Sequence, residues 1–178
     1  MKILSLMVIF LIINPNDAAI IYNFKKEKSV ANWNIVDDGV MGGLSRGSIS
    51  LTNEGNAIYQ GYVTTENNGG FSSVRYSFNK KNVTQYSHIM LKVKGDGKTY
   101  QFRIKENSYQ RYSYINYFDT SGTWETIRLP LKDFYPSYRG YKLNRPNFNG
   151  KHIEEVTFLI GNKVKEKFAL EIESISLE

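Results

Sequence analysis

The chain has 178 residues and carries 23 Lys and Arg residues against 17 Asp and Glu residues, so its formal net charge is +6. It contains no cysteine, which excludes disulfides, thiol nucleophiles and zinc sites built on cysteine. Because the basic residues are scattered along the chain and do not cluster in one run, we expect no nucleic-acid partner.

The N-terminal segment has the layout of a secretory signal peptide. An apolar run at residues 3–13 follows Lys2 and precedes the small residues Ala18 and Ala19. This run is too short to cross a bilayer as a helix, which takes roughly 20 residues. We therefore expect residues 1–19 to be a signal peptide and the protein to be exported, with no membrane span in the mature chain. Residues 20–178 are then expected to form one domain.

Apolar and polar residues alternate over most of the remaining chain, a pattern that predicts half-buried strands. Strands are expected at residues 47–51, 57–63, 74–78, 89–94, 100–105, 112–118, 124–129, 155–160 and 168–177. Gly95, Asp96 and Gly97 supply turn residues between two of them, and we expect residues 89–94 and 100–105 to pair as a hairpin. The pattern predicts an all-β fold, an antiparallel sandwich of about ten strands.

Two features interrupt this regular pattern near the C-terminus. Residues 135–151 are expected to form a long loop, and long loops in compact domains are often functional. The last strand changes its alternation midway, because Leu170 and Ile175 lie on opposite parities although both are apolar. A bulge near Glu173 and Ser174 would account for that change.

Glycine-rich segments separate several of the strands. Residues 37–45 read Asp-Asp-Gly-Val-Met-Gly-Gly-Leu-Ser, residues 66–75 read Glu-Asn-Asn-Gly-Gly-Phe-Ser-Ser-Val-Arg, and residues 94–100 read Lys-Gly-Asp-Gly-Lys-Thr-Tyr. Glycine permits backbone angles that other residues avoid, so these segments are expected to be tight corners. The residues expected to shape the corners and their surroundings are Asp38, Gly42, Gly43, Asn68, Gly69, Gly70 and Trp124, with Trp33 and Trp124 in or near the core.

In this order, and with the later pieces Trp124-Glu125, Leu129-Pro130, Arg139-Gly140 and residues 168–172, the segments resemble the CIA30 family, named after the complex I intermediate-associated protein of 30 kDa. The resemblance implies a galactose-binding-like β-sandwich, or jelly roll, similar to that of some carbohydrate-binding modules. It also implies a non-enzymatic role, since the mitochondrial relatives act as chaperones in the assembly of respiratory complex I. The leader departs from that pattern, because a mitochondrial presequence is Arg-rich and amphipathic.

The sequence offers little for catalysis. Asp37 and Asp38 are adjacent, and neighbouring strand residues point to opposite faces, so we do not expect the two carboxylates to share an acid–base site. We expect one of them to cap the following turn. Asp38 is at most a weak candidate for a calcium ligand. His88 and His152 lack a metal-binding spacing. We therefore expect no enzyme activity, no metal and no cofactor.

A binding site is easier to place. Tyrosine rings stack on sugars, and Arg and Asn side chains bind hydroxyl groups, while Tyr and Arg also dominate protein interfaces. We expect one sheet face to carry Arg75, Arg103, Tyr112, Tyr114 and Asn116. Arg139 in the long loop either contacts a partner or ties the loop to the sandwich by bonding carbonyls. Three alternatives stay open for the face: a protein partner, a carbohydrate, or tyrosines that merely cover the sheet.

Overall fold

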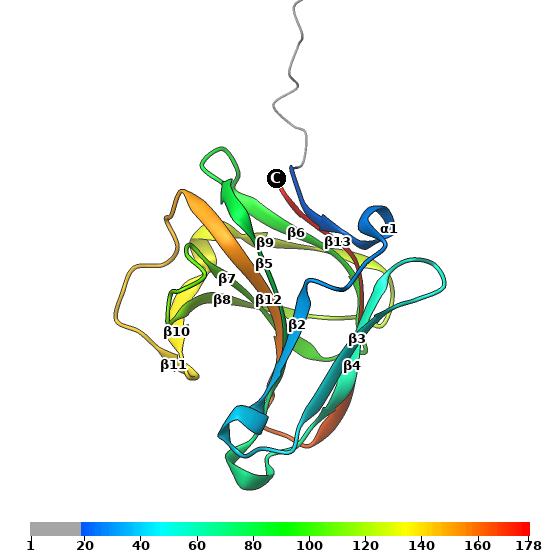
Figure 1. The fold of residues 1–178 in the computed structure, drawn as a ribbon. Helices are drawn as coiled ribbons and strands as arrows, with labels where there is room; N and C mark the ends of the chain where they lie inside the picture. Colours follow the sequence, from blue (N-terminus) through cyan, green and yellow to red (C-terminus); the bar gives the residue numbers. More distant parts are fainter. Residues whose placement is uncertain (1–18) are drawn as a thin grey trace, which may run out of the picture.

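The structure is a computed structural model and describes residues 19–178, in which thirteen strands form two antiparallel sheets (Figure 1). The first, sheet A, has the order β3 (Arg46–Leu51), β4 (Ala57–Val63), β13 (Glu166–Leu177), β6 (His88–Lys94) and β9 (Glu125–Pro130), and β1 (Ala19–Asn23) pairs with β13 beside that path. The second, sheet B, has the order β11 (Tyr141–Lys142), β10 (Tyr135–Tyr138), β8 (Ser113–Asp119), β7 (Thr99–Lys105), β12 (His152–Ile160), β5 (Ser72–Asn82) and β2 (Trp33–Asp37). The predicted all-β sandwich is confirmed.

The helical segments are short and lie at the ends of strands. They are α1 (Phe24–Glu27), η1 (Asp38–Met41), η2 (Glu66–Asn68) and η3 (Leu131–Asp133). Among the described residues, no helix is both long and apolar enough to span a membrane. The expected signal peptide lies outside the described residues except for Ala19, which opens β1 and pairs with Leu177.

The core fills the space between the two sheets. Every second residue of β7 and β6 points into it, which leaves Tyr100, Phe102 and Leu91 fully buried. The ring of Phe102 meets that of Phe158 from β12 edge to face, with 4.9 Å between centroids. Each such fully buried large side chain contributes about 1.5–3 kcal/mol through the hydrophobic effect, so alternation along the strands is sufficient to hold the layers together.

The expected hairpin of residues 89–94 and 100–105 is wrong. The first of these strands is β6, which pairs with β13 and β9 in sheet A, whereas the second is β7, which pairs with β12 and β8 in sheet B. The glycine-rich segment between them crosses from one sheet to the other. Alternation in sequence reports which face of a strand is buried, but it does not report which strand lies beside it.

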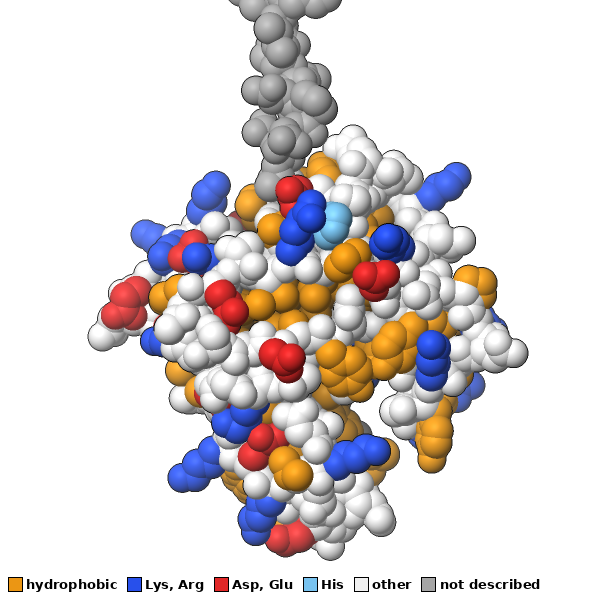
Figure 2. Space-filling view, turned by 180° about the vertical axis from the view of Figure 1, so that it is seen from behind, with side chains coloured by type: hydrophobic (Ala, Val, Ile, Leu, Met, Phe, Trp, Pro, Cys, Tyr) orange, Lys and Arg blue, Asp and Glu red, His pale blue; other side chains and the backbone are white. Residues whose placement is uncertain are grey.

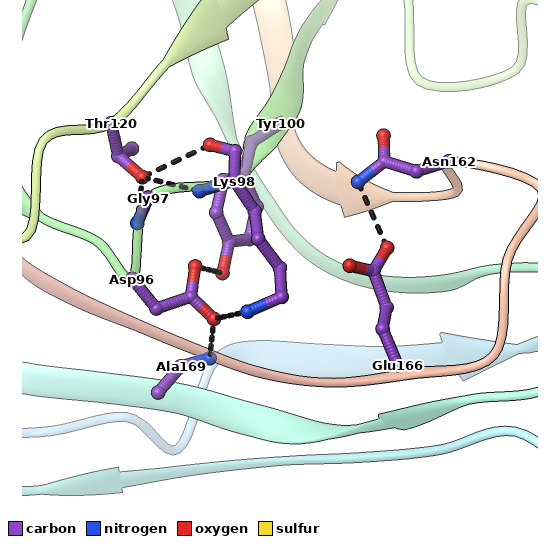
Figure 3. Close-up of polar contacts among 8 residues, drawn as sticks. All are labelled: Asp96, Gly97, Lys98, Tyr100, Thr120, Asn162, Glu166 and Ala169. Carbon is purple, nitrogen blue, oxygen red and sulfur yellow. Dashed lines mark hydrogen bonds and ion pairs between the residues drawn. The ribbon is translucent and has the colours of Figure 1, made fainter.

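Asp96 fixes this crossover. Its carboxylate accepts hydrogen bonds from the Tyr100 hydroxyl at 2.9 Å, from Lys98 Nζ at 2.7 Å and from the Ala169 backbone N–H at 3.0 Å (Figure 3). Ala169 belongs to β13, so one side chain ties the crossover to sheet A. Burial, and then the neighbouring Asp96 carboxylate, raise the pKa of the Tyr100 hydroxyl. Nearby, Thr120 Oγ1 accepts from the N–H groups of Gly97 and Lys98, as Figure 3 also shows.

The predicted bulge in the last strand is confirmed. The register between β13 and β6 shifts between Ile172 and Ser174. The shift allows Leu170 and Ile175 both to reach the core although they lie on opposite parities, and both are fully buried. The bend also allows β13 to pair with β4 along its first half and with β1 along its second half.

Candidate functional site

The first two glycine-rich segments meet at one end of the sandwich, around the buried carboxylate of Asp38. Asp38 Oδ1 accepts from the Ser45 backbone N–H at 3.0 Å. Its Oδ2 accepts from Ser45 Oγ at 2.5 Å, from the Gly70 N–H at 2.6 Å and from the Phe71 N–H at 3.3 Å. One side chain therefore joins two separate corners, and it reaches Phe71, 33 residues further along the sequence.

The identity of the glycines follows from this arrangement. A Cβ atom on Gly43 would lie 2.2 Å from Asp38 Oδ1, and one on Gly69 would lie 2.6 Å from Asp38 Oδ2. Gly42 and Gly70 have φ angles of +90° and +140°, which side-chain-bearing residues rarely adopt. Of the corner residues named from the sequence, Gly43, Gly69 and Gly70 thus lie against one buried carboxylate.

The contacts of Asp38 do not favour a calcium site. Burial raises the pKa of the Asp38 carboxyl, but the hydrogen bonds from Ser45, Gly70 and Phe71 outweigh burial and hold its pKa below the usual range. These partners are N–H and O–H donors, whereas calcium requires oxygen ligands. No group of three or more His, Asp or Glu side chains within residues 19–178 is placed to hold a metal ion.

Asp37 is engaged in a separate network. Its Oδ2 accepts from the Gly47 N–H at 3.0 Å, and its Oδ1 accepts from Ser72 Oγ at 2.6 Å. Ser72 Oγ in turn accepts from the Tyr59 hydroxyl at 2.8 Å. The two adjacent carboxylates therefore bind different donors and do not share a site, as the alternation of the strand predicts.

The outward side of sheet B is hollowed. Thr157 and Leu159 each have an exposed fraction of 4%, although they point away from the core. On the outward side of sheet A, by contrast, Tyr62 is 43% exposed. Figure 2 shows the molecule hollowed between the β10–β11 hairpin and the end that carries η1 and η2, with hydrophobic side chains along the hollow. We call this side of sheet B the concave face.

The strand register assembles the concave face from distant parts of the chain. Thr157 on β12 pairs with Arg75 on β5 and with Arg103 on β7, so the two arginines flank it. Beyond Arg103 the same row continues to Ile115 on β8 and Tyr135 on β10. The next row contains Leu159, Gln101 and Tyr117.

A hydrogen-bond network runs across this face. Arg103 donates from Nε and Nη2 to Gln101 Oε1, at 3.0 and 2.6 Å. Gln101 Nε2 donates to the Tyr117 hydroxyl at 3.1 Å. Burial, and to a smaller extent the like charge of Arg75, lower the pKa of the Arg103 guanidinium to about 10. Burial and hydrogen bonding with Tyr117 raise the pKa of Tyr135 to about 12.

The structure separates the residues that the sequence placed on one face. Arg75 and Arg103 lie on the concave face, but Asn116 pairs with Phe102 and Tyr114 pairs with Ile104, on the side of β8 that faces the core. Tyr114 is only 7% exposed. The expected single face of Arg75, Arg103, Tyr112, Tyr114 and Asn116 is therefore wrong, because β8 presents its odd-numbered residues to the concave face.

Sequence reasoning missed Gln101, Tyr117 and Tyr135 as members of the face. The signal for Tyr117 was present, because it alternates with the buried Phe118 and shares the parity of Ile115. Tyr135 carried no such signal, since residues 135–151 looked like a loop. That segment contains the strands β10 and β11, which form a hairpin at the edge of sheet B.

The β10–β11 hairpin forms a basic rim beside the concave face. Arg111 and Arg139 lie over the ring of Tyr138, at 5.6 and 5.5 Å from its centroid, and Lys142 lies 5.1 Å from that of Tyr135. At the far end of the rim, the Arg145 guanidinium lies 5.3 Å from the centroid of the Tyr112 ring. The contacts found for Arg139 are with this ring and not with backbone carbonyls, so they do not support the role of a loop tie.

Two further expectations concern residues away from this face. Trp33 is buried at 5% exposure, but Trp124 is 37% exposed, so its expected place in or near the core is wrong. His88 lines a pocket of about 780 Å³ with Tyr86, Leu131 and Phe148, at the opposite end of β5 from the Asp38 corner. His88 and His152 belong to no group of described side chains suited to a metal ion.

The sequence matches known proteins along most of its length. The family model described as Complex I intermediate-associated protein 30 (CIA30) matches residues 22–172. The protein named Complex I intermediate-associated protein 30, mitochondrial, from Drosophila melanogaster is 23% identical over 94% of this chain and 65% of its own length. The Caenorhabditis elegans protein named as its probable counterpart is 23% identical over 93% of this chain and 55% of its own length.

The chain thus spans between 55% and 65% of the length of these two curated relatives. Both are named as mitochondrial, as is a further relative from Caenorhabditis briggsae. These names contradict the expected export, and they point to a mitochondrial location instead. The export prediction depended on residues 1–19 alone. The alternating pattern of the strands carries no information about the location of the protein, so it could not correct that prediction.

Among solved structures, the fold is similar to that of carbohydrate-binding modules. The family 11 module of the cellulosomal cellulase Lic26A-Cel5E of Clostridium thermocellum superposes with a TM-score of 0.65 and 19% sequence identity, over 90% of this chain and 93% of the module. A family 11 module from Clostridium thermocellum in complex with a β-1,3-1,4-mixed-linked tetrasaccharide gives a TM-score of 0.64, also at 19% identity, over 90% of this chain and 94% of that module. At this level of identity the similarity establishes the fold alone.

Proposed function

The chain belongs to the CIA30 family, and on that premise we propose that it is a non-catalytic binding domain that holds a protein partner on the concave face of sheet B. The observation that carries the proposal is the burial of Thr157 and Leu159 at the bottom of an open hollow. Surfaces that are hollowed and partly apolar are the usual places for binding.

The chemistry of the face suits binding better than catalysis. Among the described residues that line it, Arg103, Gln101 and Tyr117 bond to one another, and Glu155 is paired with Lys105 at 2.9 Å. A general acid or base needs a group poised to exchange a proton near neutral pH, and an arginine with a pKa of about 10 is not such a group. Aromatic and arginine side chains are instead the residue types that dominate protein interfaces.

The names of the relatives indicate what kind of partner to test. They are named for association with an intermediate of complex I. We place the partner of this chain among the subunits of such an intermediate. Since the chain spans only part of those relatives, the proposal concerns one binding surface and not the whole activity of a longer protein.

A carbohydrate is the second candidate, because a structure of similar fold holds a mixed-linked tetrasaccharide. Tyr117 and Tyr135 on the concave face could stack on sugar rings. The two candidates differ in their expected ligand, so one pair of measurements separates them.

The experiment compares the protein with a variant that carries Tyr117→Ala and Tyr135→Ala together. Capture of complex I subunits from a mitochondrial extract should be lost in this variant, whereas Tyr62→Ala on the outward side of sheet A should leave capture unchanged. Affinity electrophoresis in a gel that contains mixed-linked β-glucan tests the alternative. Retardation by the glucan without capture of any complex I subunit would favour the carbohydrate.

A further inference from the structure

Within residues 19–178, the two arginines of the concave face lack a carboxylate partner. The six ion pairs found among residues 19–178 include neither Arg75 nor Arg103. The nearest acidic residue in the strand register is Glu155, two residues before Thr157, and its charge is already matched by Lys105 at 2.9 Å. The face therefore presents two positive charges that its own carboxylate does not neutralise.

The guanidinium of Arg103 is held in a fixed orientation. Its Nε and Nη2 both donate to Gln101 Oε1, and Gln101 is held in turn through Nε2 by the Tyr117 hydroxyl. These bonds use one edge of the guanidinium. The Nη1 group makes no hydrogen bond within the described chain, and a guanidinium edge of this kind binds carboxylates with good geometry.

The rim extends the positive charge beyond the two arginines. Residues 134–151 contain Arg139, Lys142, Arg145 and Lys151 but no Asp or Glu. The first three of these cations lie over tyrosine rings. Aromatic rings attract a cation without cancelling its charge, so the rim remains available to anions.

We propose that the concave face and its basic rim bind an acidic, extended segment of a protein, with one carboxylate at Arg103 and others at Arg75 and the rim. This inference rests on the proposed function and adds the chemistry of the partner to it. Arg75 and Arg103 are two strands apart, or about 10 Å between backbones. Two glutamates separated by one residue in an extended chain have backbones about 7 Å apart. Their flexible side chains cover the remaining distance, so the two carboxylates reach both arginines.

The test is a fluorescence-anisotropy titration of the protein with a labelled peptide of alternating Glu and Ser. A peptide of alternating Gln and Ser serves as the neutral control. The Glu peptide should bind, and its affinity should fall steeply as salt rises from about 50 mM to about 300 mM, because exposed charges are screened. Equal binding of the Gln peptide would overturn the proposal.

Variants assign the binding to the face. Arg103→Gln and, separately, Arg75→Gln should each weaken binding of the Glu peptide by about tenfold or more, the loss expected for a charged hydrogen-bonded pair at an interface. Arg128→Gln is the matched control, because Arg128 lies on β9 of sheet A and pairs with Glu178 at 2.8 Å. Wild-type affinity in both concave-face variants would overturn the proposal, and circular dichroism shows that each variant is folded.

Two outcomes separate this inference from the function on which it rests. Capture of complex I subunits without any binding of the Glu peptide would refute the acidic segment and leave the proposed function standing. Binding of polygalacturonate without binding of the Glu peptide would assign the carboxylates to an acidic polysaccharide and overturn the peptide as occupant.

Discussion

Arg103 and Gln101, two residues apart on the same strand, are joined by a forked hydrogen bond in which Nε and Nη2 of the arginine share one amide oxygen at 3.0 and 2.6 Å. An amide oxygen accepts these bonds but carries no charge. The guanidinium is therefore partly removed from water without the carboxylate that usually compensates it, and removing an ion from water is costly. Holding the positive charge in a fixed position on this face therefore lowers the stability of the fold.

The first prediction concerns the stability cost of the Arg103 guanidinium. Replacing Arg103 with Met retains the apolar stem and removes the charge, but it also leaves Gln101 Oε1 without its two donors. Because these effects oppose each other, we expect the free energy of unfolding to change by less than about 2 kcal/mol. Urea denaturation of both proteins at neutral pH measures it. Arg128→Met, at an exposed position of sheet A, should change stability little. A loss of several kcal/mol in Arg103→Met would show that the guanidinium holds the sheet together.

This face also shows how far the sequence could be interpreted. Alternation identified the strand that carries Arg103 and the strand that carries Tyr114, but whether the two residues share a face depends on how the strands pair. Arg103 pairs with Ile115, so Tyr114 points to the other side. A shift of one residue in register would reverse that result, and nothing in a single sequence fixes the register of strands that are not joined by a tight turn.

The corners were easier to predict, because glycine-rich segments report local backbone requirements. The sequence identified Gly43 and Gly69 as corner residues, but it could not show that both approach the same carboxylate of Asp38.

The predicted burial of Trp124 was wrong because the sequence does not show which strand lies at the edge of a sheet. A tryptophan beside a strand suggests burial on average, yet it stands just before the edge strand β9, where only one side of the chain is covered.

The second prediction concerns Asp38. Asp38→Asn replaces one acceptor oxygen by an NH₂ group that faces the donors of Ser45 or Gly70, so we expect a loss of about 2–4 kcal/mol at pH 7. Denaturant titration provides the measurement. Asp119→Asn is the control, because Asp119 is exposed and its carboxylate accepts a bond from Thr99 Oγ1.

The pH dependence of the Asp38 contribution has a definite sign. Because the pKa of Asp38 is lowered in the folded protein, its stabilising effect is fully present above the ordinary carboxyl pKa of about 4 and is lost as the pH falls through the folded value. The stability difference between wild type and Asp38→Asn should therefore shrink between pH 6 and pH 3. A difference that stays constant over this range would mean that the carboxylate is not the stabilising form.

The third prediction separates two kinds of glycine. A Cβ on Gly61 would lie 2.0 Å from the backbone oxygen of Arg46 on the neighbouring strand β3, whereas a Cβ on Gly97 would meet nothing within 4 Å. Gly61→Ala should therefore force β3 and β4 apart and cost about 3 kcal/mol or more. Gly97→Ala should cost about 1–2 kcal/mol, because its φ of +80° is unfavourable for alanine. Thermal melts of the two variants would contradict this explanation if their order were reversed.

The fourth prediction concerns Tyr100, whose hydroxyl is buried and donates to Asp96 at 2.9 Å. Because its pKa is raised in the folded protein, the neutral hydroxyl stabilises the fold below the ordinary tyrosine pKa of about 10, and this contribution is lost as the pH rises further. Tyr100→Phe should cost about 1–2 kcal/mol at pH 8, the value of one hydrogen bond to a charged group, and this deficit should shrink at about pH 11. Urea denaturation at both pH values provides the comparison, with Tyr109→Phe as a control because Tyr109 is 92% exposed. A deficit equally large at both pH values would contradict the role of the neutral hydroxyl. No deficit at pH 8 would show that Lys98 and Ala169 hold the crossover at Asp96 without help from the hydroxyl.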